Sequence, residues 1–335
     1  MSTRIPQFDL APDWQQPPGP HAHRDVSAVD VDSRDRVYLF TRFDDQVLVY
    51  EPDGRYLRSW GRGIFSTAHG LTLGANDRVY CVDVADHTVR AFTPDGELLM
   101  TLGLPGHASD TGYVSGKPFD VHPVECVLYP GGPFNRCTNL AEAPDGTLYV
   151  ADGYGNCRVH KFSRDGKLLH SWGEIGTGPG EFHLPHGILV TADGRVLVAD
   201  RENDRIQVFD PDGHFLEAWT DVQRPCDLAA DQDGLIYVAE LWRPRGKKSF
   251  VHGVALTDQP GRVSVLAPDG RTLARWGADP VDRTAPGNFI APHSITVDSR
   301  GDVYVAEVTF SFAITPGWVP PTAAHHQIQK FVRRP

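Results

Sequence analysis

Three histidines of this 335-residue chain lie in similar local settings that suit metal binding. The settings are Ala68-His69-Gly70, Leu184-Pro185-His186-Gly187 and Ala291-Pro292-His293-Ser294. Three neutral imidazoles that converge on one point bind zinc or a similar divalent ion and leave coordination positions open for water or substrate. Because the histidines lie far apart in the sequence, the elements that carry them decide whether they meet.

Those elements repeat along the chain. Five turns with the pattern Asp-Gly mark the repeat, at 53–54, 95–96, 165–166, 212–213 and 269–270. Each turn lies between short segments of alternating apolar residues, the pattern of half-buried antiparallel strands. Two more apolar segments precede each pair, so a repeat of about 40 to 50 residues holds four strands. Six copies predict an all-β fold, a six-bladed β-propeller of four antiparallel strands per blade, formed by residues 1–335 as one domain.

The two chain ends and three long insertions complete this prediction. The sixth copy lacks an outer strand, and residues 7–20 belong to no copy, so we expect them to supply the closing strand and a strap. Residues 104–134, 241–261 and 308–325 interrupt the repeat. We expect these insertions to cover an axial face, where long loops on a rigid scaffold usually serve recognition.

The repeat register places each histidine at the start of an innermost strand. His69, His186 and His293 occupy this position in copies two, four and six, and the other copies have Ser27, Thr138 and Cys226 there. A single histidine at a propeller axis is more often a hydrogen-bonding channel residue. Three on alternate blades favour a metal tripod.

The turns after the third strands open on the same face as the histidines. They carry Arg42, Tyr154 and Arg201 in copies one, three and four. A cation beside a phenol favours the phenolate, which makes Tyr154 a candidate general base. Arg243 in the second insertion and Trp318 in the third are candidate substrate contacts.

Composition narrows the possible partners. The formal net charge of −11 argues against binding to nucleic acid or an anionic membrane. No segment reads as a signal peptide or a membrane span. Five cysteines without a CxxC pair favour buried, reduced thiols. We therefore expect a cytoplasmic protein with a small-molecule substrate; the oligomeric state stays open.

The sequence resembles a known family over nearly the whole chain outside the insertions. The resemblance lies in residues 152–158, 184–187, 199–207 and 68–71. These runs resemble peptidyl-α-hydroxyglycine α-amidating lyase, a six-bladed propeller of the NHL-repeat type. The resemblance implies that His69, His186 and His293 hold zinc, that Tyr154 is the base, and that Arg42 and Arg201 are the active-site arginines. It also implies cleavage of a carbinolamide to an amide and glyoxylate, with zinc as a Lewis acid.

The chain departs from the family at several positions. Ser294 replaces an acidic ligand of a structural calcium, which makes calcium doubtful here. Ala291 replaces a methionine expected near the substrate, and Gly155 replaces a disulfide cysteine beside the base. The monooxygenase that supplies a peptide substrate is absent from this chain. Amidated peptide hormones are therefore not the expected product.

The sequence thus predicts a zinc-dependent lyase that cleaves a carbon–nitrogen bond of a small α-hydroxyglycine substrate. A different divalent transition metal suits the same ligands. Two alternatives stay open. One is a metal-dependent hydrolase that uses the same tripod on a lactone, ester or amide. The other is a non-catalytic NHL scaffold that binds protein.

Overall fold

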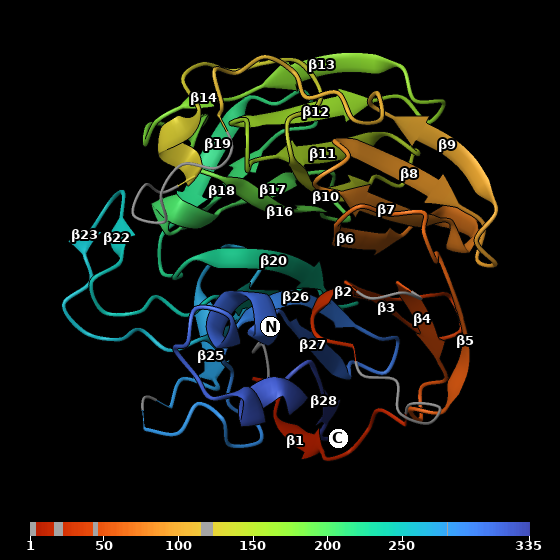
Figure 1. Cartoon of the computed structure of the whole chain (residues 1–335), viewed down its shortest axis with the longest axis vertical. Coiled ribbons are helices and arrows are strands. Elements are labelled where there is room, and N and C mark those ends of the chain that lie inside the picture. Colours follow the sequence, from red (N-terminus) through yellow and green to blue (C-terminus); the bar gives the residue numbers. More distant parts are fainter. Residues whose placement is uncertain (1–4, 17–22, 43–45, 115–122, 280) are drawn as a thin grey trace. The chain divides into compact units, whose positions relative to one another are not determined.

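The computed structural model describes residues 5–16, 23–42, 46–114, 123–279 and 281–335. Six four-stranded antiparallel sheets confirm the predicted all-β, six-bladed β-propeller (Figure 1). The chain divides into two compact units: unit 1 comprises residues 1–62, 226–247 and 254–335, and unit 2 comprises 63–225 and 248–253. The prediction of one domain over 1–335 stays a prediction.

Unit 2 contains the second, third and fourth blades. Their strands, from the inner to the outer, are β6 (Ala68–Leu73), β7 (Val79–Asp83), β8 (Thr88–Phe92) and β9 (Leu98–Leu102); β10 (Cys137–Glu142), β11 (Leu148–Asp152), β12 (Arg158–Phe162) and β13 (Leu168–Trp172); β16 (Pro185–Val190), β17 (Val196–Asp200), β18 (Arg205–Phe209) and β19 (Phe215–Trp219). A short parallel pair, β14 (Glu174–Ile175) and β15 (Glu181–Phe182), links the third blade to the fourth.

The second strand of each of these blades forms the core of unit 2. All residues of β7, β11 and β17 are buried, whereas most residues of the outer strand β9 are exposed. Facing blades pack through aromatic and β-branched side chains, among them Tyr149, Trp172 and Phe209. Such side chains suit a pleated surface that is covered on both faces. The core thereby fixes where the inner strands and the turns beyond β11 and β17 lie.

Unit 1 contains the first, fifth and sixth blades. Their strands are β2 (Val26–Val31), β3 (Val37–Thr41), β4 (Val47–Tyr50) and β5 (Tyr56–Trp60); β20 (Pro225–Ala230), β21 (Ile236–Glu240), β24 (Arg262–Leu266) and β25 (Thr272–Trp276); β26 (Pro292–Val297), β27 (Val303–Glu307), β28 (Ile328–Arg333) and β1 (Phe8–Ala11).

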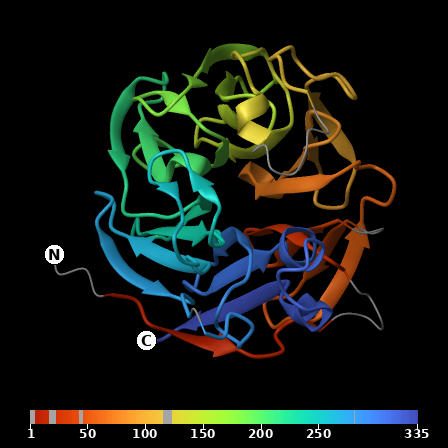
Figure 2. The ribbon, with the colours of Figure 1, turned by 60° about the vertical axis from the view of Figure 1, so that its left-hand side comes forward.

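The N-terminal strand supplies the outer strand of the sixth blade, as predicted. β1 pairs antiparallel with β28, from Phe8 opposite Arg333 to Ala11 opposite Lys330 (Figure 2). Next to this strand, the Trp14 indole donates to the Pro52 carbonyl over 2.9 Å. Residues 17–20 of the predicted strap lie outside the described residues.

One predicted turn shows why its glycine is needed. Gly54 has a φ of +89°, and a Cβ added there would lie 1.7 Å from the Trp14 carbonyl oxygen. Only a residue without a side chain permits this approach. The Asp-Gly turn after β4 therefore also seats the N-terminal segment.

The three insertions contain little regular structure. The first holds the 3₁₀ turn η2 (Pro123–Cys126), and its residues 115–122 lie outside the described part. The second holds the short strands β22 (Lys248–Ser249) and β23 (Gly253–Val254). The third holds the π-helical turn η4 (Phe310–Ile314) and the 3₁₀ turn η5 (Pro321–His325). Their placement over an axial face stays a prediction.

Two compositional predictions can be compared with the structure. All five cysteines are buried, as predicted. Within the described residues, no helix has the length and apolar character needed to cross a membrane.

Candidate metal centre and active site

The three predicted metal ligands occupy the same place in three inner strands. His69, His186 and His293 are the second residues of β6, β16 and β26, as the repeat register predicted. Each is almost fully buried. One ring nitrogen of each lies within 4.8 Å of the others, near enough to hold one metal ion.

Backbone carbonyls orient two of these rings for metal binding. His69 Nδ1 lies 2.6 Å from the Thr138 carbonyl oxygen, and His293 Nδ1 lies 2.7 Å from that of Ser27. Because a carbonyl only accepts, we assign the hydrogen to Nδ1, which leaves the Nε2 lone pair for a ligand bond. Thr138 and Ser27 are the residues that replace histidine in the neighbouring blades. The backbone of the neighbouring inner strand therefore orients each of these two rings.

The loop after β11 carries Tyr154 to this cluster. The Tyr154 hydroxyl lies 3.3 Å from His69 Nε2 and 3.2 Å from His186 Nε2. The single hydroxyl hydrogen can serve only one of these nitrogens. Because the hydrogen of His69 is on Nδ1, its Nε2 presents a lone pair to the Tyr154 hydroxyl. Lone pairs of nitrogen and oxygen atoms thus converge at this point, which suits a bound cation.

The turn after β17 brings Arg201 to the same hydroxyl. Arg201 begins η3 (Arg201–Asn203), and its Nη1 donates to Tyr154 Oη over 3.2 Å. Its guanidinium carbon lies 5.3 Å from the centre of the tyrosine ring. The structure thus brings together the predicted base and one of the two predicted arginines.

Arg201 has a buried partner that the sequence did not predict. Arg201 Nε donates to Glu202 Oε1 over 2.8 Å, and Arg224 Nη2 donates to the same oxygen over 2.7 Å. Glu202 directly follows Arg201, which was a weak signal. Arg224 lies after the next outer strand, so no local pattern connects it to the site.

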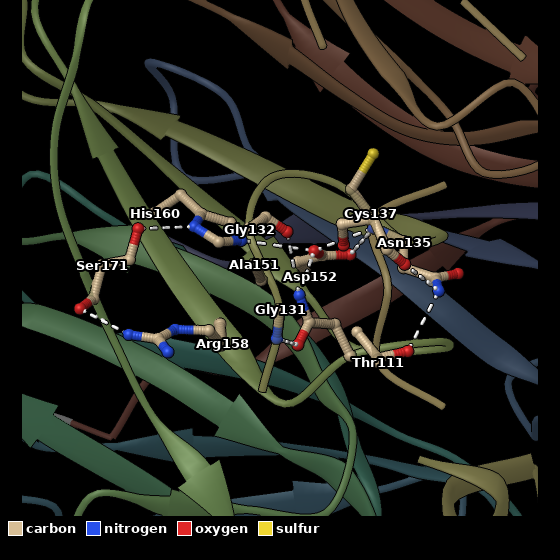
Figure 3. A network of polar contacts seen from close by, with 12 residues as sticks. Thr111, Gly131, Gly132, Asn135, Cys137, Ala151, Asp152, Arg158, His160 and Ser171 are labelled. Atoms are coloured by element: carbon tan, nitrogen blue, oxygen red, sulfur yellow. Dashed lines mark hydrogen bonds and ion pairs between the residues drawn. The ribbon is translucent and has the colours of Figure 1, made fainter. Parts of the chain in front are cut away.

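A buried aspartate anchors the loop that carries Tyr154 (Figure 3). The Asn135 N–H donates to both oxygens of Asp152, over 3.1 and 3.0 Å, and Asn156 Nδ2 donates over 2.8 Å. His160 Nε2 lies 3.2 Å from the same carboxylate. An acid ends the second strand in five of the six blades, at Asp83, Asp152, Asp200, Glu240 and Glu307. This recurrence was visible in the sequence and could have identified the anchor.

The other predicted arginine belongs to unit 1. Arg42 Nη1 donates to Asp25 Oδ2 over 3.2 Å and to Ser311 Oγ over 2.7 Å. Burial raises the pKa of Asp25, and Arg42 partly opposes that shift. These contacts tie Arg42 to the third insertion. Its catalytic role stays a prediction.

The predicted substrate contacts also lie in unit 1. Arg243 is buried and donates from Nη1 to Gln259 Oε1 over 3.2 Å. The Trp318 ring is partly exposed and lies 5.7 Å from that of Trp242. Ala291 packs in the same apolar cluster as Trp242. Contact of Arg243, Trp318 and Ala291 with a substrate stays a prediction.

Ser294, the residue that made calcium doubtful, has a buried acidic neighbour. Its hydroxyl donates to Asp227 Oδ2 over 2.7 Å. Burial raises the pKa of Asp227 to about 7, and the bond from Ser294 opposes this shift. Position 294 thus hydrogen-bonds to a protein carboxylate from β20.

The fold and the site define an NHL-repeat β-propeller with a histidine cluster near enough to hold a metal ion. Residues 182–209 match the NHL repeat. Over 283 residues the chain is 34% identical to NHL repeat-containing protein 3 of Mus musculus, covering 81% of this chain and 73% of the relative. The chain therefore belongs to the NHL-repeat family.

Relatives with a named activity are more distant. Peptidyl-alpha-hydroxyglycine alpha-amidating lyase 1 of Drosophila melanogaster is 29% identical over 283 residues, 79% of this chain and 47% of that protein. Peptidyl-glycine alpha-amidating monooxygenase A of Xenopus laevis is 28% identical over 331 residues, 92% of this chain and 31% of that protein.

Solved structures agree on the fold. A virginiamycin B lyase from Staphylococcus aureus has a TM-score of 0.58 at 12% identity, covering 97% of this chain and 99% of that one. A gluconolactonase from Xanthomonas campestris has a TM-score of 0.57 at 12% identity, covering 93% and 88%. At this identity the likeness shows the fold alone.

Proposed function

We propose that this protein is a zinc-dependent, amidating-lyase-like enzyme that cleaves the carbon–nitrogen bond of a small α-hydroxyglycine or carbinolamide substrate. The observation that carries the proposal is the position of the Tyr154 hydroxyl. It lies within 3.3 Å of His69 Nε2, of His186 Nε2 and of Arg201 Nη1. A candidate base thus lies directly beside candidate metal ligands and beside a cation.

His69, His186 and His293 would hold the metal ion. Three neutral imidazoles suit zinc, and other divalent transition metals suit the same donors. When bound, the metal supplies Lewis acidity to the substrate hydroxyl. The carbonyls of Thr138 and Ser27 keep two ligand rings in the required tautomer and orientation.

Tyr154 would move the proton. As the phenolate, it takes the proton of the substrate hydroxyl, the carbon–oxygen bond becomes a carbonyl, and the carbon–nitrogen bond breaks. The nitrogen leaves with its bonding electrons and receives the proton, so the products are an amide and glyoxylate. Arg201 stabilises the phenolate by a charge-assisted hydrogen bond. Arg42 is the candidate for the carboxylate of the substrate.

The test is glyoxylate release from α-hydroxyhippurate by zinc-reconstituted protein. Tyr154→Phe should lower kcat by at least about 100-fold, since a positioned general base contributes about 10² to 10⁴. Tyr56→Phe is a matched control, because Tyr56 is a half-buried phenol of the outer strand β5 that donates to Ser59 Oγ. Full activity in Tyr154→Phe would contradict the proposed role of the tyrosine.

The same reaction separates the alternatives. A lyase releases benzamide and glyoxylate, whereas hydrolysis of the amide releases benzoate that carries oxygen from labelled water. Benzamide without label is the expected product. Labelled benzoate would favour the hydrolase, and the absence of any turnover would favour the non-catalytic scaffold.

A further inference from the structure

Three buried charged side chains of unit 2 form a row of hydrogen-bonded groups that ends at the Tyr154 hydroxyl. Arg224 Nη2 and Arg201 Nε both donate to Glu202 Oε1, over 2.7 and 2.8 Å. Arg224 Nε also donates to Glu202 Oε2 over 3.2 Å. From the far side of its guanidinium, Arg201 Nη1 reaches Tyr154 Oη. Glu202 is 1% exposed, so water contributes little to this arrangement.

Because of the geometry of the guanidinium, Glu202 controls the direction in which Arg201 donates. The group is planar, and its donors point in fixed directions. When Glu202 holds the Nε edge, Nη1 is aimed at Tyr154. Without that contact, the long Arg201 side chain gains rotamer freedom and its donor is no longer held in place.

These three side chains together carry a net positive charge. A carboxylate beside a single arginine would cancel most of its positive charge at the tyrosine. Arg224 supplies a second cation to Glu202, so the three side chains keep a formal charge of +1. A buried carboxylate needs such pairing, because an unpaired charge inside a protein is strongly destabilising.

The tip of the second insertion supports the same row of charged side chains. The Arg224 N–H donates to Asp204 Oδ1 over 2.8 Å, and Ser249 Oγ donates to Asp204 Oδ2 over 2.6 Å. The Phe250 N–H donates to the Glu202 carbonyl over 3.3 Å. Residues 248–253 thus brace the turn that carries Arg201.

We propose that Glu202 is a positioning residue, which holds Arg201 against the Tyr154 hydroxyl and is itself held by Arg224. The kinetic part of this inference rests on the proposed function.

The first test shortens the side chain and keeps its charge. Glu202→Asp should lower kcat about tenfold or more, with KM and metal content unchanged. Glu217→Asp, at an exposed glutamate of β19, is the matched control. Wild-type kcat in Glu202→Asp would overturn the inference.

A double-mutant cycle shows whether Glu202 acts through Arg201. In an Arg201→Ala background, Glu202→Asp should cause no further loss of kcat. A merely structural role would reduce activity equally in both backgrounds, and that result would overturn the inference.

A structural measurement separates this inference from the proposed function. If the wild type releases no glyoxylate, the proposed function fails while the positioning claim can still be tested. A crystal structure of Glu202→Asp should place Arg201 Nη1 beyond about 3.5 Å from Tyr154 Oη, outside hydrogen-bond distance. An unchanged contact would overturn the positioning role.

Discussion

Two loops of unit 2 hold the candidate catalytic groups from the same place in the repeat, but their anchors differ. Loop 152–157 carries Tyr154, and loop 200–205 carries Arg201. Each begins with a fully buried aspartate at the end of a second strand. The described partners of Asp152 are a backbone N–H, Asn156 and His160. Asp200 additionally pairs with a guanidinium, that of Arg205, over 2.8 Å.

This difference shows what the repeat fixes and what it leaves free. The buried acid holds the backbone of both loops, since Asp152 accepts from the Asn135 N–H and Asp200 accepts from the His183 N–H. The side chain one or two positions later then supplies the chemistry. A common anchor thus allows a phenol in one blade and a guanidinium in the next. The partners of each buried aspartate determine how much its removal lowers the free energy of unfolding.

The largest expected effect is the loss of the charged anchor. Asp200→Ala leaves the guanidinium of Arg205 buried without its carboxylate, and removal of one partner of a buried pair costs about 3 to 5 kcal/mol. Urea unfolding at pH 7 measures this change in the free energy of unfolding. A loss below about 1 kcal/mol would show that water or other groups replace the carboxylate.

A smaller effect is expected for the other anchor. Asp152→Ala leaves three hydrogen-bonding groups without a partner, those of Asn135, Asn156 and His160. Asp200→Ala also leaves three, those of His183, Asn203 and Gln207, and in addition it leaves the charged guanidinium of Arg205 without its carboxylate. The cost of the unpaired groups, about 1 to 3 kcal/mol each when buried, is therefore common to both variants. The same unfolding experiment should therefore show a smaller loss than Asp200→Ala. The reverse order would contradict the view that the ionic partner distinguishes the two loops.

The smallest expected effect is a change in how the free energy of unfolding depends on pH in Asp200→Asn. Burial raises the pKa of Asp200 from 3.8 to about 6, although Arg205 opposes the shift. Because the folded-state pKa is raised, the stabilisation is present below pH 3.8 and is lost as pH rises through about 6. The wild type should lose about 1 kcal/mol through this group between pH 5 and 7. Asp200→Asn should remove this loss, which is measured by urea unfolding at several pH values. The same slope of unfolding free energy against pH in the variant and the wild type would contradict this prediction.

The sequence predicted the elements and the histidine cluster because both depend on the repeat period. Turn residues and alternating apolar residues mark each strand, and a common offset placed the three histidines on equivalent strands. Tyr154 and Arg201 followed from the same register. The pairing of β1 with β28 was predictable because one blade lacked a strand.

The supporting contacts could not be predicted in the same way. The bonds from histidine Nδ1 to the Thr138 and Ser27 carbonyls depend on how neighbouring blades pack. The contact of Arg224 with Glu202 joins two connecting segments that are separated by β18 and β19, and no pattern in the chain pairs them. The conformations of the insertions have no repeat to define them. These features depend on packing between segments that are distant in sequence.

The central claim is that the three histidines hold a metal ion beside Tyr154, and its most direct test is the metal content of the reconstituted protein. Elemental analysis should find about one zinc per chain in the wild type, as a three-histidine site requires. His170→Ala, at an exposed histidine of β13, should keep the metal, and His186→Ala should lose most of it. A metal-free wild type, or equal metal in His186→Ala, would contradict the claim.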